Sequence, residues 1–140
     1  MHNPINTVIA FVLLVAAVGG SFYYIYSTQP YLGVEGREVT PAIAKVLGLQ
    51  EAKGILISQV KAGSPAEHGG LKGGDKIANI DGQEMKVGGD VITGIDGIPI
   101  QGVDDAESLL ATKKIGDSVK FTIIRDTAVQ EITVVIGGGG

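Results

Sequence analysis

The distribution of charge along the chain limits which part of it can fold as a domain in water. Residues 1–30 contain no Lys, Arg, Asp or Glu, so all 11 basic and 15 acidic residues of the 140-residue chain lie in 31–140. Within the uncharged part, residues 7–26 are almost continuously apolar. Twenty residues of helix span ~30 Å, about the thickness of a bilayer core. The sequence therefore predicts an N-terminal region 1–30, made of a transmembrane helix over 7–26 and a short linker, followed by a folded domain.

Two features bear on how the apolar run is used. Tyr23, Tyr24 and Tyr26 close the run, as an aromatic belt at a membrane interface would. Ala17-Val18-Gly19 has the small-x-small pattern of a signal-peptide cleavage site, so a cleaved, secreted form stays open as the alternative. We expect a single membrane pass that places the following domain outside the cytoplasm.

Composition excludes several function classes for residues 31–140. The net charge of −4, with no basic cluster, argues against a nucleic-acid partner. The chain has no cysteine, and its two histidines, His2 and His68, have no serine partner or second ligand near them in a recognisable motif. Ser118 follows Gly-Asp at the start of a predicted strand, which is typical of a turn residue. We therefore expect no catalytic residue, no metal, no cofactor and no enzymatic activity.

Residues 31–136 predict an α+β domain that is rich in turns. A helix after Thr40-Pro41 and a single helical turn after Ser64-Pro65 each begin with an N-cap residue followed by proline. The amphipathic pattern over 103–113 predicts the longest helix, with acidic residues in its first turn and lysines at its end. Strands are predicted from β-branched or alternating residues at 34–39, 54–60, 119–124 and 132–136.

A near-duplication lies in the middle of this domain. Residues 73–82 recur fifteen residues later as 88–97, with seven of ten positions identical, and each copy runs from Gly-Gly-Asp through a short strand to an Asp-Gly turn. Two copies are too few for a solenoid. The pair predicts either two neighbouring strands or one strand and an inserted hairpin. At the end of the chain, residues 137–140 are four glycines, and we expect a flexible tail there.

The order of these motifs resembles a PDZ domain of the HtrA/Deg type over nearly all of residues 31–136. The segments that carry the resemblance are Tyr31-Leu32-Gly33-Val34, Gly63-Ser64-Pro65-Ala66-Glu67, Gly70-Leu71-Lys72-Gly73-Gly74-Asp75, the stretch 89–97, and Gly116-Asp117-Ser118-Val119 after the long helix. The resemblance implies a PDZ-like, partly open β-barrel or sandwich of five to six strands with two short helices.

The resemblance also implies a peptide-binding groove between the strand after Val34 and the helix at 103–113. An extended peptide can add as a strand to such an edge, and a glycine-containing bend can aim several N–H groups at its terminal carboxylate. The residues implied for carboxylate binding are Leu32, Gly33 and Val34. Those implied for the groove and its pocket are Tyr31, Leu32, Val34, Val103, Ala106, Glu107 and Leu110. A carboxylate at Glu107 would disfavour acidic peptide side chains.

We therefore expect a membrane-tethered module that captures C-terminal or extended segments of other proteins, with a protease as a further candidate partner. Proteins of this type carry a serine protease domain before the PDZ domain, and no motif of such a domain stands between the apolar run and Tyr31. Two alternatives stay open. The chain could be the PDZ part of an HtrA-like serine protease whose catalytic domain is missing or supplied in trans. It could also be an assembly or scaffold domain whose groove is closed.

Overall fold

The structure is a computed structural model that describes residues 30–138. Its helices and strands follow one another along the chain as β1 (Pro30–Tyr31), β2 (Val34–Glu38), α2 (Pro41–Leu47), β3 (Ile55–Val60), α3 (Pro65–Gly69), β4 (Lys76–Ile80), β5 (Gln83–Val87), β6 (Val91–Ile95), β7 (Ile98–Pro99), α4 (Val103–Leu110), β8 (Ser118–Arg125), β9 (Ala128–Val135) and β10 (Gly137–Gly138).

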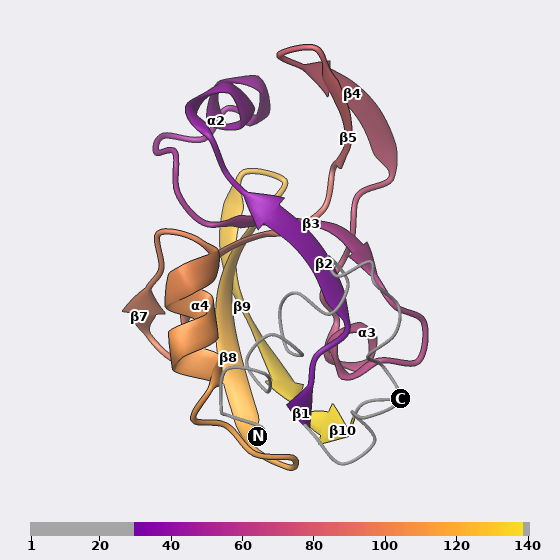
Figure 1. Cartoon of the computed structure of the whole chain (residues 1–140), viewed down its shortest axis with the longest axis vertical. Coiled ribbons are helices and arrows are strands. Elements are labelled where there is room, and N and C mark those ends of the chain that lie inside the picture. The colour runs from indigo at the N-terminus through magenta and orange to yellow at the C-terminus, as the bar shows by residue number, and fades with distance from the viewer. Residues whose placement is uncertain (1–29, 139–140) are drawn as a thin grey trace, which may run out of the picture.

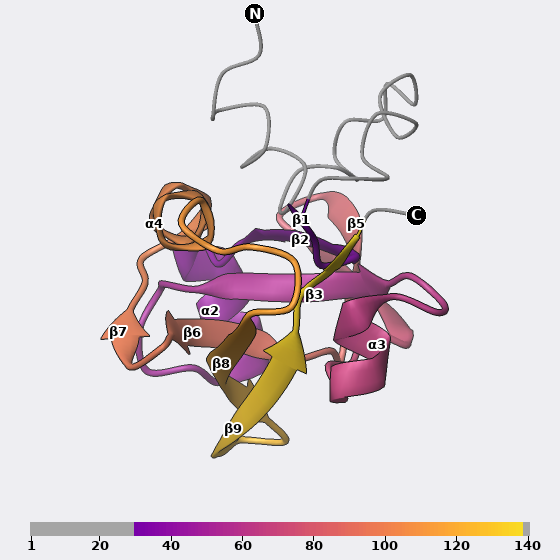
Figure 2. The ribbon, with the colours of Figure 1, turned by 90° about the horizontal axis from the view of Figure 1, so that it is seen from below.

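The main sheet is antiparallel and holds six strands in the order β2-β3-β6-β8-β9, with β7 paired to β6 (Figure 1). Its two edges are therefore β2 and β9. Two further pairs lie outside this sheet, the β4–β5 hairpin and the short β1–β10 pair. Figure 1 shows β1 beside β10, and Figure 2 shows β1 leading directly into β2, so both ends of the described chain lie next to the start of an edge strand.

The helix starts predicted from the sequence are confirmed by their capping bonds. The hydroxyl of Thr40 accepts the N–H of Ile43 at 3.2 Å, and proline stands in the first turn of α2. Ser64 accepts the N–H of Glu67 at 3.2 Å in the same way at the start of α3. Gly48 ends α2 with φ at 72°, a conformation that glycine adopts without strain.

Side chains of β3 alternate between two hydrophobic clusters, one on each face of the strand. Ile55 and Ile57 belong to a first cluster that includes side chains of α4, β6 and β8. Leu56, between them, belongs to a second cluster formed with α2 and the β4–β5 hairpin. Consequently α4 and the hairpin cover opposite faces of the β2–β3 ribbon (Figure 1).

The near-duplication is an inserted hairpin, the second of the two interpretations. The first copy continues into β4 of the hairpin, whereas the second copy continues into β6 of the main sheet. The N–H of Asp90 donates to the carbonyl of Lys72 at 3.0 Å, although the two residues are 18 positions apart in the sequence and the hairpin lies between them. A Cβ built on Gly89 would lie 2.7 Å from the carbonyl carbon of Gly73. The chain thus leaves and re-enters the domain at one place.

Three expectations need correction. The described residues hold three helices rather than two, because the turn at α3 is a helix. The long helix ends at Leu110 and not at 113, since the chain turns where the N–H of Lys113 donates to the Leu110 carbonyl at 3.0 Å. Gly137 and Gly138 pair with β1 as β10, so only 139–140 of the predicted glycine tail lie beyond the described residues.

The predicted transmembrane helix over 7–26 lies outside the described residues. Among the helices of residues 30–138, none is both long enough and apolar enough to cross a bilayer.

One buried carboxylate joins three parts of the fold. Asp90 is 1% exposed, and its two oxygens accept the Nε and Nη2 of Arg125, each at 2.8 Å. The same carboxylate accepts the N–H of Lys72 at 2.9 Å, and Nη2 of Arg125 also donates to the carbonyl of Gly70 at 2.7 Å. This bidentate pair therefore ties the end of β8 to the end of α3 and to the start of β6.

Replacing this carboxylate should destabilise the domain strongly. Asp90→Asn leaves the guanidinium of Arg125 facing a neutral amide, and breaking such a buried pair costs about 3 kcal/mol. The free energy of unfolding, measured by urea denaturation, reports the loss. Asp75→Asn is the matched control, because Asp75 holds the same place in the first copy but is exposed; its cost should stay within about 0.5 kcal/mol. Equal costs for the two variants would contradict this role of Asp90.

Candidate functional site

The loop between β1 and β2 is anchored by hydrogen bonds that two of its carbonyl groups accept from α3 and from the residue after β3. The carbonyl of Leu32 accepts the N–H of Ala66 in α3 at 3.0 Å. The carbonyl of Gly33 accepts the N–H of Lys61, at the end of β3, at 2.9 Å. Gly33 has φ at 89°, and a side chain there would collide with Ser64, which caps α3. Glycine is therefore required at this position both by the backbone conformation and by the close approach of α3.

These two bonds turn the following N–H groups in the opposite direction. In a trans peptide, the N–H of one residue points away from the carbonyl of the residue before it. The N–H groups of Gly33 and Val34 consequently point away from α3 and β3. The Lys61 bond also flanks the Val34–Val60 pair, which makes this a pair of the non-hydrogen-bonded kind. Among the hydrogen bonds formed within residues 30–138, none uses the N–H of Leu32 or Gly33.

β2 continues from this loop as an edge strand with α4 along one face. Val34, at its start, lies in the first hydrophobic cluster with side chains of α4. Glu38, at its end, accepts the N–H of Val103 at 3.0 Å. The N-cap residue of α4 is Gly102, which has no side chain, so the carboxylate from β2 caps the helix in its place. The contact fixes the start of α4 against the far end of β2.

Most of the predicted pocket residues meet in the first hydrophobic cluster. Leu32 and Val34 come from the loop and β2, Ala106 and Leu110 come from α4, and Val103 packs against them while partly buried. All four of the cluster members are at most 5% exposed. The structure thus brings the apolar side chains of the loop and of α4 together in one buried cluster.

Tyr31 lies apart from that cluster. Its side chain is buried, its ring centroid is 5.9 Å from the ammonium nitrogen of Lys61, and its hydroxyl has no hydrogen-bond partner within the described part of the chain. Burial raises the pKa of its phenol above the ordinary value.

Glu107 is a half-buried carboxylate on α4. One of its oxygens is buried, and no donor from residues 30–138 reaches it. Burial raises the pKa of Glu107, and the negative charge of Asp104 one turn earlier raises it further. A carboxylate in this state favours a neighbouring hydrogen-bond donor or a cation and disfavours a second anion.

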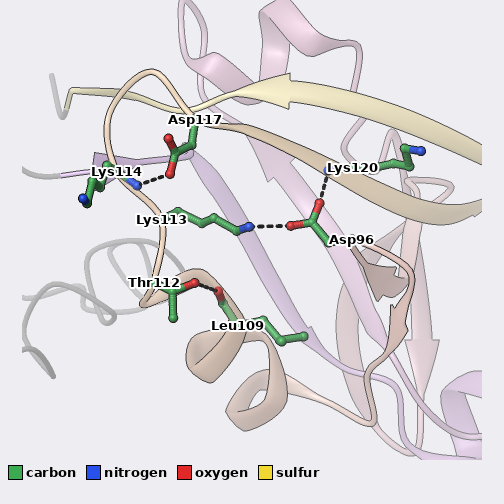
Figure 3. Close-up of polar contacts among 7 residues, drawn as sticks. All are labelled: Asp96, Leu109, Thr112, Lys113, Lys114, Asp117 and Lys120. Carbon is green, nitrogen blue, oxygen red and sulfur yellow. Dashed lines mark hydrogen bonds and ion pairs between the residues drawn. The ribbon is translucent and has the colours of Figure 1, made fainter.

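The other end of α4 is clamped by a lysine and an aspartate (Figure 3). Nζ of Lys113 lies 2.5 Å from Oδ2 of Asp96, in the turn after β6, and Oδ1 of Asp96 accepts the N–H of Lys120 at 2.8 Å. Just beyond, the N–H of Lys114 donates to the carboxylate of Asp117 at 2.8 Å. The helix is therefore anchored at both ends by residues that are distant in the sequence.

Three of these positioning residues were missed by sequence reasoning. Glu38, Asp96 and Lys113 have no unusual spacing or composition around them, and Asp96 belongs to an Asp-Gly turn that the sequence explains on local grounds alone. A weak signal existed for Glu38, because a helix that begins after a glycine needs an acceptor from elsewhere.

Comparison with protein families matches this fold over most of the described chain. Two family profiles, each described as PDZ domain, match residues 25–87 and 87–136. The chain is 32% identical over 110 residues to a Rhizobium meliloti (strain 1021) protein named probable periplasmic serine endoprotease DegP-like, covering 79% of this chain and 19% of that protein. It is 29% identical over 105 residues to the periplasmic pH-dependent serine endoprotease DegQ of Escherichia coli (strain K12), covering 75% and 20%. The chain therefore spans about a fifth of the length of these curated relatives.

Solved structures give the same result. A structure titled HtrA-type protease AlgW with decapeptide is 27% identical with a TM-score of 0.61, and the match covers 79% of this chain and 30% of that one. The HtrA3 PDZ domain bound to a phage-derived ligand has a TM-score of 0.60 over 79% of this chain and 88% of that chain. At 16% identity, this second likeness shows the fold alone.

The clamp at the end of α4 predicts a pH-dependent contribution to stability. Burial opposes the charged form of Asp96, but hydrogen bonds from Lys113 and from the N–H of Lys120, with the charges of both lysines, lower its pKa overall. The stabilisation is therefore complete above the ordinary aspartate pKa and is lost as pH falls through the lowered value. Asp96→Asn should destabilise the domain at about pH 6 and cost progressively less towards about pH 2, as measured by urea denaturation at each pH.

Asn is chosen because Asp96 has φ at 51°, a conformation that Asn tolerates. Asp81→Asn is the control, since Asp81 has φ at 55° in the corresponding turn of the hairpin and is exposed. A cost at Asp96 that does not change with pH would refute the ion-pair explanation.

Proposed function

Since the chain belongs to the PDZ domain family of the HtrA/Deg type, we propose that it captures C-terminal segments of other proteins as an added strand on β2. The observation that carries this proposal is the direction of the N–H groups of Gly33 and Val34, which point away from the body of the domain at the start of an edge strand. A peptide running antiparallel to β2 would place its terminal carboxylate at these groups. The N–H of Leu32 would supply a third donor.

The final side chain of such a peptide would lie against the apolar surface of the pocket. Leu32 and Val34 would line it from the loop and β2, and Ala106 and Leu110 would line it from α4; their packing together in one cluster supports this assignment. Val103 would face the middle of the peptide, with Glu107 one turn further on. The unpartnered carboxylate of Glu107 would favour a peptide residue that donates a hydrogen bond and disfavour an acidic one. Tyr31, buried beside Lys61, would support the loop from the other side.

We further propose that residues 7–26 tether this module to a membrane and that the domain lies outside the cytoplasm. The uncharged run of the sequence supports the tether, and the periplasmic names of the two curated relatives support the compartment. Fractionation tests the tether: the protein should stay with membranes in alkaline carbonate and be released by detergent. Release by carbonate would contradict it.

Two other functions fit the same domain. As part of an HtrA-like serine protease, the module would present substrates to a catalytic domain, which agrees with the proteases among its relatives. As an assembly domain with a closed groove, it would bind no free peptide. Peptide titration separates the second of these from the proposal.

Binding should depend on a free terminal carboxylate. A peptide ending in an apolar residue should bind with a micromolar Kd, about 8 kcal/mol. Amidation of its terminus should weaken binding by at least about tenfold, because charge-assisted hydrogen bonds to the loop are lost. Isothermal titration of the two forms measures the difference, and equal affinities would remove the carboxylate role from Leu32, Gly33 and Val34.

Substitution of the loop glycine gives an independent test with a matched control. Gly33→Ala should weaken binding of the free-carboxylate peptide by at least about tenfold, because the new methyl group pushes the loop away from Ser64. Gly48→Ala imposes a similar backbone strain, with φ at 72°, but its methyl group would meet no atom within 4 Å. Its affinity should equal that of the wild type. A Gly33→Ala variant that stays folded and binds normally would count against the loop.

A further inference from the structure

The second face of β2 carries a wall that the peptide-binding site described so far does not use. Side chains alternate along β2, so Val34 and Glu38 lie on the α4 face, whereas Glu35 and Arg37 lie on the opposite face. That opposite face is the one covered by the β4–β5 hairpin, because Val39, next in the same alternation, packs in the cluster that contains hairpin residues.

A hollow of about 480 Å³ lies between β2 and the hairpin. Glu35, Gly36 and Arg37 line it from β2, and Ile77, Glu84 and Lys86 line it from the hairpin. A second hollow of about 580 Å³ continues from it towards α2 and shares Arg37 and Met85 with the first. The edge that would receive a peptide is therefore flanked by α4 on one face and by a lined hollow on the other.

The hollow combines balanced charges with one exposed apolar side chain. Its four charged residues comprise two carboxylates, on Glu35 and Glu84, and two cations, on Arg37 and Lys86, so it has no net charge. Ile77 is the apolar residue that stands out, with 63% of its surface exposed. A large apolar side chain so exposed gains stability when an apolar partner covers it.

We propose that the β4–β5 hairpin forms a second specificity wall, which binds apolar side chains at the peptide positions one and three before the C-terminal residue. This inference rests on the proposed addition of a peptide to β2. In an added strand, the final side chain and every second one before it face α4, so the side chains between them face the hairpin. The partners selected are C-terminal tails that are apolar on both faces and not only at the residue that enters the pocket.

The test uses two pairs of free-carboxylate peptides. The first pair carries Leu or Ala at the two hairpin-facing positions, and the second carries Leu or Ala two positions before the end, where the side chain faces α4. Wild-type protein should bind the Leu peptide of the first pair about five- to tenfold more tightly, as expected for covering roughly half of one or two apolar side chains.

Ile77→Ser should abolish the Leu preference in the first pair and leave the preference in the second pair unchanged. Ile77 is exposed, so this variant should fold as the wild type does. Val129→Ser is the matched control, because Val129 is 70% exposed on β9, on the other edge of the sheet, and should keep both preferences.

The outcomes separate the two proposals. Peptides that bind by a free carboxylate but show no Leu preference in the first pair, or one that Ile77→Ser leaves intact, overturn the hairpin wall and leave the groove standing. Failure of every peptide to bind the wild type overturns the groove and the wall together. Loss of both preferences in Ile77→Ser would also overturn the wall, because the substitution would then act on the domain as a whole.

Discussion

The direction of two peptide groups sets what the start of β2 can do. The carbonyls of Leu32 and Gly33 are held by donors from α3 and from the residue after β3, and each bond turns the next N–H away from the body of the domain. Had either carbonyl pointed outward, the same loop would present an acceptor to a ligand and repel a carboxylate. The orientation depends in turn on the close approach of α3, which leaves room for no side chain at Gly33. Capping of α3 by Ser64 and the geometry of the loop are thus one structural feature.

The duplicated segment shows how far identical residues can diverge when their surroundings differ. Asp90 is buried and binds Arg125 through two hydrogen bonds, whereas Asp75, its counterpart, is exposed at the base of the hairpin. Asp96 clamps α4 through Lys113, whereas Asp81 occupies an exposed turn with nearly the same φ. Local sequence determines the turn in both copies, since Asp-Gly adopts it with or without partners. Tertiary position alone decides which copy carries the ion pairs.

Features set by neighbouring residues could be predicted from the sequence, whereas features set by contacts between distant residues could not. The starts of α2 and α3 were predicted correctly because Thr40 and Ser64 act on residues three positions away. The end of α4 was placed too late, since the turn after Leu110 is drawn towards Asp96 and Asp117 by contacts that the helical pattern does not contain. Of the groove side chains predicted from the family resemblance, Leu32, Val34, Ala106 and Leu110 lie in one cluster, whereas Tyr31 and Glu107 do not. Glu38 was missed because its partner, the N–H of Val103, lies 65 residues away.

The main sheet has two edges, β2 and β9, and their surroundings differ. An open edge presents unpaired N–H and carbonyl groups that would pair with any extended chain. On β9, α3 packs close to Val134, so a Cβ on Gly69 would lie 2.6 Å from that side chain. Beside β2, by contrast, α4 packs against one face and the β4–β5 hairpin against the other, and the N–H groups of Gly33 and Val34 point away from the domain at the start of the strand. In the proposed mode of binding, a strand that ends in a carboxylate would accept hydrogen bonds there that an internal segment cannot accept, so the edge would favour chain termini over other extended chains.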